Sequence, residues 1–483
     1  MPELPGRDRG PDPTGPRPVT AGFVRGLDLH LDVGEGRGRG RALEAALREA
    51  VRSGRLAPGA RLPGSRSLAV DLGLSRGTVV QVFGQLVAEG WLVGVAGSGT
   101  VVGPVSAGSP LPEPEGRPAP TVSGPGIDLR PGRPDLSAFP RTPWARAVRR
   151  ALAGSAASLD YVEPAGLPVL RAAVAEHVGR TRGVRASPDA VVVTAGFTQA
   201  LALLARVAQR LGMRQAGVED PGFARHREVL GAGGLNPVPL PVDDAGADPG
   251  ALPDEPALTL LTPAHQHPYG VVLAPARRAA TVEWARRCDG FVVEDDYDGE
   301  FRYDRQPVGA MQPLDPERIV FAGSVSKTLA PGMRLGWLVV PRALRAPLEA
   351  EMTAFGAGVP AVDQLALADL LSRGEYDRHV RRMRLVYRAR RQELGARLAA
   401  IGAPPPAGVA AGLHALLPLT SAEEERQTVK AAQRAGVRLH GLHTGHYWHR
   451  PAPDRPGALV IGYATPAGHA WRGALDALTE LLR

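Results

Sequence analysis

The sequence predicts two folded domains of different class: a winged helix-turn-helix domain, followed by a larger α/β domain. Three observations lead to this organisation. Apolar residues recur at helical spacing in the first hundred residues, a stretch rich in proline and glycine follows, and short β-branched runs then alternate with helical segments. A chain of 483 residues is also too long for one ordinary hydrophobic core, so more than one domain is expected.

We expect the winged helix-turn-helix domain at residues 20–102, a linker at 103–126 and the α/β domain at 127–483. Twelve of the 24 linker residues are proline or glycine. Proline lacks the backbone N–H that helices and sheets use, so this stretch is expected to join two separately folded parts as an extended segment.

Composition narrows the class of protein further. The single cysteine, Cys288, excludes an intramolecular disulfide framework and suits a reducing compartment. No charge-free apolar run approaches the length of a membrane span, and the polar, proline-rich N-terminus lacks the apolar core of a signal peptide. We therefore expect a cytoplasmic protein without a membrane partner.

The first domain carries the pattern of a helix-turn-helix. A first helix has apolar residues between positions 43 and 51 and ends near Gly54, and a second is expected to begin with Ser65 as its N-cap. A tight turn containing Gly73 leads to a third helix, which buries Val79, Val82, Phe83 and Leu86. The two β-branched runs that follow, "WLVGVAGSGTVV", predict a hairpin wing.

Polar residues at the start of the third helix are the candidate DNA contacts. Ser75, Arg76 and Thr78 lie outside the apolar pattern, where a recognition helix meets base edges and phosphates and where the helix dipole favours an anion. Arg66, at the start of the second helix, is placed to reach the DNA backbone. Residues 37–76 contain nine arginines and three acidic residues. Because arginine is abundant everywhere in this chain, a helical packing module with solvated arginines remains the alternative.

Residues 53–102, "SGRLAPGARLPGSRSLAVDLGLSRGTVVQVFGQLVAEGWLVGVAGSGTVV", closely resemble the winged helix of GntR-family transcription regulators. The resemblance implies that the chain binds double-stranded operator DNA. It implies contacts by Arg66, Arg76, Thr78 and the wing tip at Gly97.

In the second domain, three clusters of polar residues follow apolar strands, where ligands bind in open α/β sheets. "TAGFTQAL" (194–201) ends a strand and opens a helix, with Thr198 near an N-terminus suited to phosphate. "VVEDDYDGEF" places Asp295 and Tyr297 after a strand, although an acidic loop that binds a metal or nothing is the alternative. "GSVSKTLAPGMRLG" (323–336) contains Lys327 with Ser324, Ser326 and Arg334.

Lys327 is notable because the chain has 55 arginines and only one other lysine, Lys430. Arginine stays protonated at physiological pH, whereas a lysine amine can lose its proton and attack a carbonyl. A lysine, a phosphate-binding turn, an acidic residue for a ring nitrogen and an arginine for phosphate together predict pyridoxal 5'-phosphate (PLP) as the cofactor.

Residues 159–335 resemble a fold-type I aminotransferase, because "YVEPAGLPVLRAAVAEHV", "TAGFTQAL", "VEDPGF", "TPAHQHPYG", "EDDYDGEF" and "SVSKTLAPGMRLG" come in family order. The resemblance implies a Schiff base between Lys327 and PLP, the one catalytic role predicted. It implies that Asp295 pairs with the pyridine nitrogen, that Tyr297 contacts the ring oxygen and that Phe223 stacks on the ring. The implied phosphate ligands are Gly196, Phe197, Thr198, Ser324 and Arg334, and Ser326 is a further hydroxyl donor beside the lysine.

A GntR-type winged helix followed by an aminotransferase-like domain is the arrangement of the MocR subfamily. The resemblance covers nearly the whole chain. It implies a PLP-dependent transcription regulator that forms a head-to-tail homodimer. It also implies an effector that is an amino compound or PLP itself.

Two departures bear on whether such a protein is an enzyme. "HPYG" replaces the "NPTG" of most aminotransferases, so His267 stands where an asparagine contacts the ring oxygen. The arginine that grips a substrate carboxylate is not evident either, and Arg450 is the nearest candidate. We expect transaminase activity to be vestigial, and an active aminotransferase with an appended DNA-binding domain is the alternative. No metal is expected, because His443, His446 and His449 lack a metal-binding spacing.

The segment "RHVRRMRLVYRARR" (378–391) contains seven arginines and resembles the small-domain helix of the same subfamily. We expect a solvated helix face with Val380, Met383 and Tyr387 turned inward. A second patch that contacts DNA is the alternative.

Overall fold

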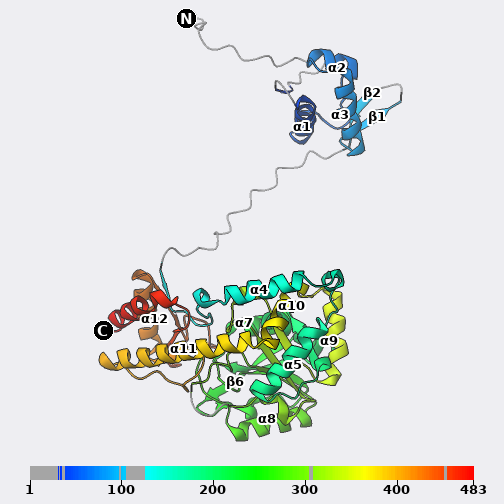
Figure 1. Ribbon diagram of the computed structural model, residues 1–483. Helices are drawn as coiled ribbons and strands as arrows, with labels where there is room; N and C mark the ends of the chain where they lie inside the picture. The colour runs from blue at the N-terminus through cyan, green and yellow to red at the C-terminus, as the bar shows by residue number, and fades with distance from the viewer. Residues whose placement is uncertain are drawn as a thin grey trace, which may run out of the picture. The chain divides into compact units, whose positions relative to one another are not determined.

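The computed structural model describes residues 31, 33–34, 38–96, 99–104, 126–303, 308–450 and 454–483 (Figure 1). The chain divides into two compact units, Met1–Val122 and Ser123–Arg483. Most of the expected linker, residues 105–125, lies outside the described residues. Among the described helices, none combines the length and apolar character that crossing a membrane requires.

The first unit has the predicted order of helices and strands. It contains α1 (Arg39–Arg52), α2 (Ser65–Asp71), α3 (Arg76–Ala88) and an antiparallel hairpin of β1 (Leu92–Val95) and β2 (Gly99–Val102). Gly73 adopts a φ of +59° in the turn between α2 and α3. Glycine adopts this left-handed conformation at little cost because it has no Cβ. The predicted N-cap of α2 is wrong: the cap is Gly64, and Ser65 makes no capping hydrogen bond.

The core of this unit is apolar and shared by the three helices. Leu43, Leu68, Val79 and Leu86 are at most 1% exposed. Two arginines of α1 fix the other helices in place. The guanidinium of Arg39 donates to the carbonyl oxygens of Leu72 (2.5 Å) and Gly73 (2.9 Å), which satisfies the end of α2 and holds the turn. Arg48 pairs with Glu89 after the end of α3 at 2.8 Å.

The second unit is built around an eight-stranded, mostly parallel sheet, as predicted. Its strand order is β4-β11-β10-β9-β8-β5-β6-β7. Neighbours from β10 through β9, β8 and β5 to β6 are parallel, whereas β11 is antiparallel to both of its neighbours and β7 is antiparallel to β6. The strands are β4 (Val191–Thr194), β5 (Gln215–Asp220), β6 (Asn236–Asp243), β7 (Gly246–Ala247), β8 (Ala257–Leu261), β9 (Phe291–Asp295), β10 (Ile319–Ser324) and β11 (Gly336–Val339).

Helices cover both faces of this sheet, because its strands are apolar on both sides (Figure 1). In β4, Val192 packs in one core with α6 (Phe197–Arg210), α7 (Ala224–Ala232) and α9 (Arg342–Ala354). Its neighbours Val191 and Val193 face the opposite core. The helices of that second face are α4 (Arg141–Leu152), α5 (Pro168–Arg182), α8 (Pro275–Arg287) and α10 (Ala361–Ser372).

The rest of the second unit forms a smaller subdomain with a core of its own. Its three-stranded sheet has the order β12-β15-β14, and the short strand β3 pairs in parallel with β13. The strands are β3 (Ile127–Asp128), β12 (Ala415–Pro418), β13 (Val437–Arg438), β14 (His440–Gly441) and β15 (Ala458–Ile461), and the helices are α11 (Glu375–Ala400), α12 (Ala422–Arg434) and α13 (Trp471–Leu481).

Helix α11 carries the arginine-rich segment. The inward orientation of Val380, Met383 and Tyr387 is confirmed, since each is buried. The solvated face was wrong for one arginine: Arg390 is 5% exposed and pairs with Asp135 at 2.9 Å. A cation buried in this way requires a partner, which the sequence pattern does not reveal because Asp135 lies 255 residues away.

Candidate functional site

Three strands of the large sheet end together and bring the sequence clusters to one edge. Strands β4 and β10 run parallel to each other on either side of β11, and Gly336 of β11 pairs with both Thr194 and Ser324. Strand β9 runs beside β10, with Asp295 opposite Ala322. The loops that leave these strands therefore meet at one place. Ligands of open α/β sheets bind at this position, beyond the carboxyl ends of the strands.

The predicted phosphate site consists of two loops in close contact. Gly196 is the N-cap of α6, and Phe197 and Thr198 form its first turn. A Cβ on Gly196 would lie 3.3 Å from Nη1 of Arg334, and one on Gly336 would lie 3.0 Å from the Cα of Gly196. The first backbone N–H groups of α6 have no partner within the helix, so they and the Arg334 guanidinium offer donors to an anion at one place.

Lys327 follows β10 in the adjoining loop, and its side chain is partly buried. Its Nζ donates a hydrogen bond to the carbonyl oxygen of Gly132 at 2.6 Å. Burial lowers the pKa of the Lys327 amine below its ordinary value, although the carboxylates of Asp295 and Asp298 act in the opposite direction. A lysine in this setting gives up its proton more readily than one on the surface.

Asp295 is the last residue of β9 and is buried. Burial raises its pKa well above the ordinary value, and the charge of Lys327 only partly opposes this. Nε2 of His226 lies 4.0 Å from Oδ2 of Asp295. Burial and the charge of Lys327 lower the pKa of His226 to about 3, so that imidazole is neutral at physiological pH. A cation beside Asp295 would favour the ionised form of its carboxyl group.

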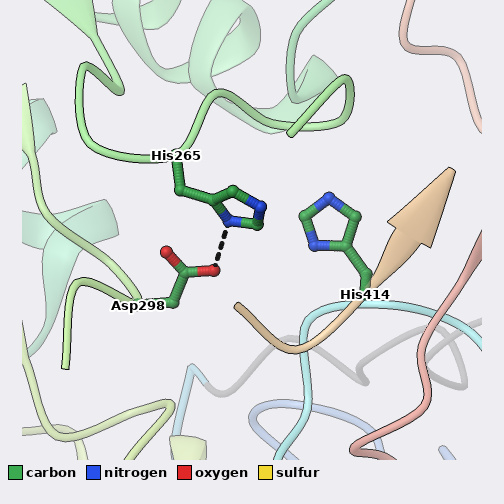
Figure 2. A group of neighbouring side chains, drawn as sticks. All are labelled: His265, Asp298 and His414. Atoms are coloured by element: carbon green, nitrogen blue, oxygen red, sulfur yellow. Dashed lines mark hydrogen bonds and ion pairs between the residues drawn. The ribbon is translucent and has the colours of Figure 1, made fainter. Parts of the chain in front are cut away.

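Tyr297 lies against a buried histidine–aspartate pair. Its hydroxyl oxygen is 3.1 Å from Nδ1 of His265, and that nitrogen lies 2.8 Å from Oδ2 of Asp298 (Figure 2). Burial, and then the charges of Asp298 and Asp295, raise the pKa of Tyr297 well above its ordinary value. The phenol therefore stays protonated and can donate a hydrogen bond to an anionic oxygen.

His267 and Phe223 line a small hollow of about 20 Å³ next to this group, together with Glu219, His226 and Thr262. The two rings meet edge to face, with centroids 6.1 Å apart. Burial, and then the charges of His414 and Lys327, keep the pKa of His267 well below its ordinary value. Its Nδ1 is buried without a hydrogen-bond partner among the described residues, so it is a polar atom available to a ligand.

The two serines beside the lysine contact each other. The backbone N–H of Ser326 lies 3.4 Å from Oγ of Ser324. Thr194, on the other side of β11, was not among the predicted site residues, yet its Oγ1 is buried without a partner within the described part of the chain. A buried hydroxyl of this kind at a strand end is a further candidate ligand.

Besides Thr194, the site includes Gly132, His226, His265 and Asp298, which were not predicted from the sequence. His265 and Asp298 lie inside "TPAHQHPYG" and "EDDYDGEF", so their presence in those motifs was a usable signal. Gly132 contributes a carbonyl oxygen, which no residue type reveals. His226 is on α7, after the predicted Phe223, with which its ring packs at a centroid distance of 5.2 Å.

His265, Asp298 and His414 form a group whose ligand atoms lie within 4.8 Å of one another (Figure 2). Imidazole and carboxylate are metal ligands, so the group has the donor types of a zinc site. Two of its members are engaged otherwise: His265 pairs with Asp298, and Nε2 of His414 lies 3.2 Å from the carbonyl oxygen of Pro268. Hydrogen bonding therefore accounts for the group, and we assign it no metal.

Arg227 occupies the region where a carboxylate-binding arginine was sought. Its guanidinium donates to the carbonyl oxygens of Gly222, His446, Tyr447 and Trp448, so it joins α7 to the segment after β14. The candidate suggested by the sequence, Arg450, is exposed and does not line the hollow beside Phe223 and His267.

In the first unit, the two arginines predicted to contact DNA, Arg66 and Arg76, are exposed. Ser75 is the N-cap of α3: its Oγ accepts a hydrogen bond from the N–H of Thr78 at 3.0 Å and lies 2.8 Å from the Thr78 hydroxyl. These two hydroxyls stabilise the start of the recognition helix, which adds a structural role to the predicted DNA contact. Gly97 lies outside the described residues.

Comparison with known proteins covers both units. Residues 40–102 match the family model "Bacterial regulatory proteins, gntR family", and residues 126–443 match "Aminotransferase class I and II", a fold that implies PLP dependence. The HTH-type pyridoxine biosynthesis transcriptional regulator PdxR of Corynebacterium glutamicum is 33% identical over 91% of this chain and 94% of its own. The probable rhizopine catabolism regulatory protein MocR of Rhizobium meliloti is 34% identical over 88% and 90%.

Solved structures of aminotransferases share the fold of the second unit. An archaeal alanine:glyoxylate aminotransferase has a TM-score of 0.65 and 22% identity, and the alignment covers 74% of this chain and 90% of that one. The α-aminoadipate aminotransferase LysN of Thermus thermophilus, at 0.64 and 23%, covers 74% and 92%. The chain therefore belongs to the GntR-type HTH transcription regulators that carry a class I and II aminotransferase domain, the family that includes PdxR and MocR.

Proposed function

We propose that the protein is a DNA-binding regulator that holds PLP on its second unit and uses it to sense an amino compound, or senses PLP itself. The observation that carries the proposal is the pairing of Lys327 and Asp295. One is an amine with a lowered pKa, and the other is a buried carboxyl group whose pKa burial raises. PLP has an aldehyde for the first and a basic ring nitrogen for the second.

The residues of the site divide the tasks of holding PLP. The phosphate would bind to the N-terminus of α6, from Gly196 to Thr198, and to Arg334, with Ser324 and Ser326 nearby. The phenol of Tyr297 is a donor for the ring oxygen, and His267, whose ring centroid lies 5.9 Å from that of Tyr297, offers its unpaired Nδ1. When bound, PLP supplies an aldehyde carbon that combines reversibly with primary amines.

In the proposed sensing mechanism, the contacts of Lys327 differ between the protein with and without a bound effector. The amine of Lys327 donates a hydrogen bond to the carbonyl oxygen of Gly132. An effector amine that takes the place of the Lys327 amine at the cofactor would change the contacts of Nζ. An effector alters DNA affinity only to the extent that it binds two conformations unequally. A head-to-tail homodimer, in which two winged helices bind two half-sites, would convert such a change into a different half-site spacing.

Two features favour sensing over turnover. His267 replaces an asparagine expected in aminotransferases, and the nearby Arg227 is bound to four backbone carbonyls rather than free for a substrate carboxylate. A regulator needs its ligand to stay bound, so weak transamination suits the role. Steady transamination of common amino acids would instead support the alternative, an active aminotransferase with a DNA-binding domain attached.

The experiment compares Lys327→Ala with the parent, using visible absorbance of the bound cofactor and binding to DNA upstream of the gene. We expect the parent to take up PLP and show the absorption band of the lysine-bound cofactor. The variant should lose that band and the response of DNA binding to amines. If the parent shows no such band when PLP is added, the proposal fails.

A second pair of variants tests the DNA side. Arg76→Ala should abolish sequence-specific binding and leave the cofactor absorbance unchanged. Arg41→Ala is the matched control, because Arg41 is an exposed arginine of α1 that loses the same charge outside the recognition helix. Equal losses in the two variants would mean that only net charge matters, and the assignment of the recognition helix would be wrong.

A further inference from the structure

A second cavity, separate from the PLP site, lies in the smaller subdomain. Its volume is about 480 Å³, within the ordinary range for small-molecule sites. Helix α12, β13, β14 and the segment after β3 form its walls. The polar residues among those lining it are Arg130, Arg426, Lys430, Gln433, Arg438 and His440, and Thr444 completes the set.

The helix contributes one continuous face to this cavity. Arg426, Val429, Lys430 and Gln433 are spaced three, four and seven residues from the first, so their side chains project from the same side of α12. Val429 is buried, whereas Lys430 is exposed. Lys430 is the second of the only two lysines in the chain, and its side chain forms neither a hydrogen bond nor an ion pair with any of the described residues.

The opposite wall is also cationic. Asp128 of β3 pairs with Arg130 at 2.8 Å, and its Oδ2 lies 3.6 Å from the guanidinium groups of both Arg133 and Arg438. One carboxylate thus faces three guanidinium groups. Nε of Arg438 is buried without a hydrogen-bond partner in the described residues.

The lining residues include no acidic side chain, although Asp128 behind the wall and Glu423 beside Arg426 contribute negative charge nearby. Burial disfavours the charge of Asp128, but the hydrogen bonds from Arg130 hold its pKa below the ordinary value, so it stays ionised. Burial and the neighbouring Arg130 lower the pKa of His440, so this imidazole is neutral at physiological pH. The cavity is then lined by three arginines and a lysine, a set suited to anionic oxygens.

We infer that this cavity binds a small phosphorylated compound, with Lys430, Arg426, Arg130 and Arg438 as its cationic ligands. The four cations come from α12, β13 and the segment after β3, and they line one concave space, as a compact polyanion requires. The phosphates of a DNA strand are spread along a line, and a flat or grooved basic face would suit them better. Arg130 precedes Gly132 in the same segment of chain, whereas Lys327, Asp295 and the phosphate-binding residues of the proposed PLP site are on other elements.

The test titrates inorganic pyrophosphate into the full chain, preloaded with PLP, by isothermal calorimetry at low ionic strength. Lys430→Glu is the test variant, and we expect it to weaken binding by about tenfold or more, because it replaces a charge-assisted contact with repulsion. Arg434→Glu is the matched control: Arg434 is exposed on the same helix and does not line the cavity. It should leave binding nearly unchanged.

Cofactor uptake is measured separately from visible absorbance, so the two proposals fail independently. The titration is repeated on Arg334→Ala, which weakens the proposed phosphate site of PLP. Pyrophosphate binding that this variant retains therefore does not come from the PLP site. Binding that survives in this variant and is lost on adding Lys430→Glu supports the cavity whether or not PLP is taken up. Absent pyrophosphate binding, or equal effects of Lys430→Glu and Arg434→Glu, would overturn the inference. So would non-specific duplex DNA binding that depends on Lys430 while pyrophosphate does not bind.

Discussion

Glu219 is a buried carboxyl group that should make the stability of the protein depend on pH. It lies near the end of β5, and the backbone N–H and hydroxyl of Thr262 donate to its two oxygens at 3.1 and 2.5 Å. Burial raises its pKa to about 7, and the hydrogen bonds from Thr262 only partly oppose this. In the unfolded chain the pKa of a glutamic acid is near 4.5.

The sign of the effect follows from where the proton is bound. Between pH 4.5 and about 7 the folded state holds this proton and the unfolded state has lost it. Stability contributed by Glu219 is therefore complete below the unfolded pKa, falls as the pH rises, and stays low above the folded pKa. The difference of about 2.5 pKa units corresponds to ~3 kcal/mol in the free energy of unfolding, an upper figure for this one group.

The assay is urea unfolding of the parent and Glu219→Gln at several pH values from about 5 to about 8. Glutamine keeps the size and one acceptor oxygen but carries no charge at any pH. The stability of the variant relative to the parent should therefore rise with pH across this interval. Glu228→Gln, at an exposed glutamate of α7, is the control and should show no such trend. A difference between Glu219→Gln and the parent that is constant across this interval would refute the reasoning.

Two further substitutions follow from the geometry. Gly196→Ala should weaken PLP binding by about tenfold or more, because a residue with a Cβ is strained at a φ of +89° and the added Cβ would press on Arg334. Fluorescence titration with PLP measures the affinity. Gly332→Ala is the control and should bind PLP normally, because open space surrounds Gly332. Arg390→Met should lower the free energy of unfolding by ~3–5 kcal/mol, because it leaves Asp135 buried without its cation. Adding Asp135→Asn should recover part of that loss in urea unfolding; no recovery would show that the charge of Asp135 is not the cause.

The elements that the sequence predicted well are those in which local pattern and burial agree. The helical spacing of apolar residues predicts the winged helix-turn-helix. In its third helix, the predicted core residues Val79, Val82 and Phe83 are all buried. The parallel sheet follows from alternating strands and helices. In the second unit, Lys327 could be singled out because its residue type is rare in this chain and chemically distinct.

Other features depend on contacts between distant segments, which periodicity does not report. Gly132 holds Lys327 through a backbone carbonyl across 195 residues, and Arg390 is buried only because Asp135 accepts its charge. The N-cap of α2 also differed from expectation, because a glycine rather than the adjacent serine has the required backbone conformation. The first two outcomes depend on tertiary packing rather than on local preference.

The hydrogen bond between Lys327 and Gly132 connects the proposed cofactor site to the first segment of the second unit. Gly132 lies shortly after β3, the first strand of the second unit, so the peptide that holds the amine belongs to the same stretch of chain that continues from the DNA-binding part. Thermodynamic reciprocity then requires that, if amines alter DNA binding through this contact, DNA binding alters the affinity of the protein for amines by the same factor.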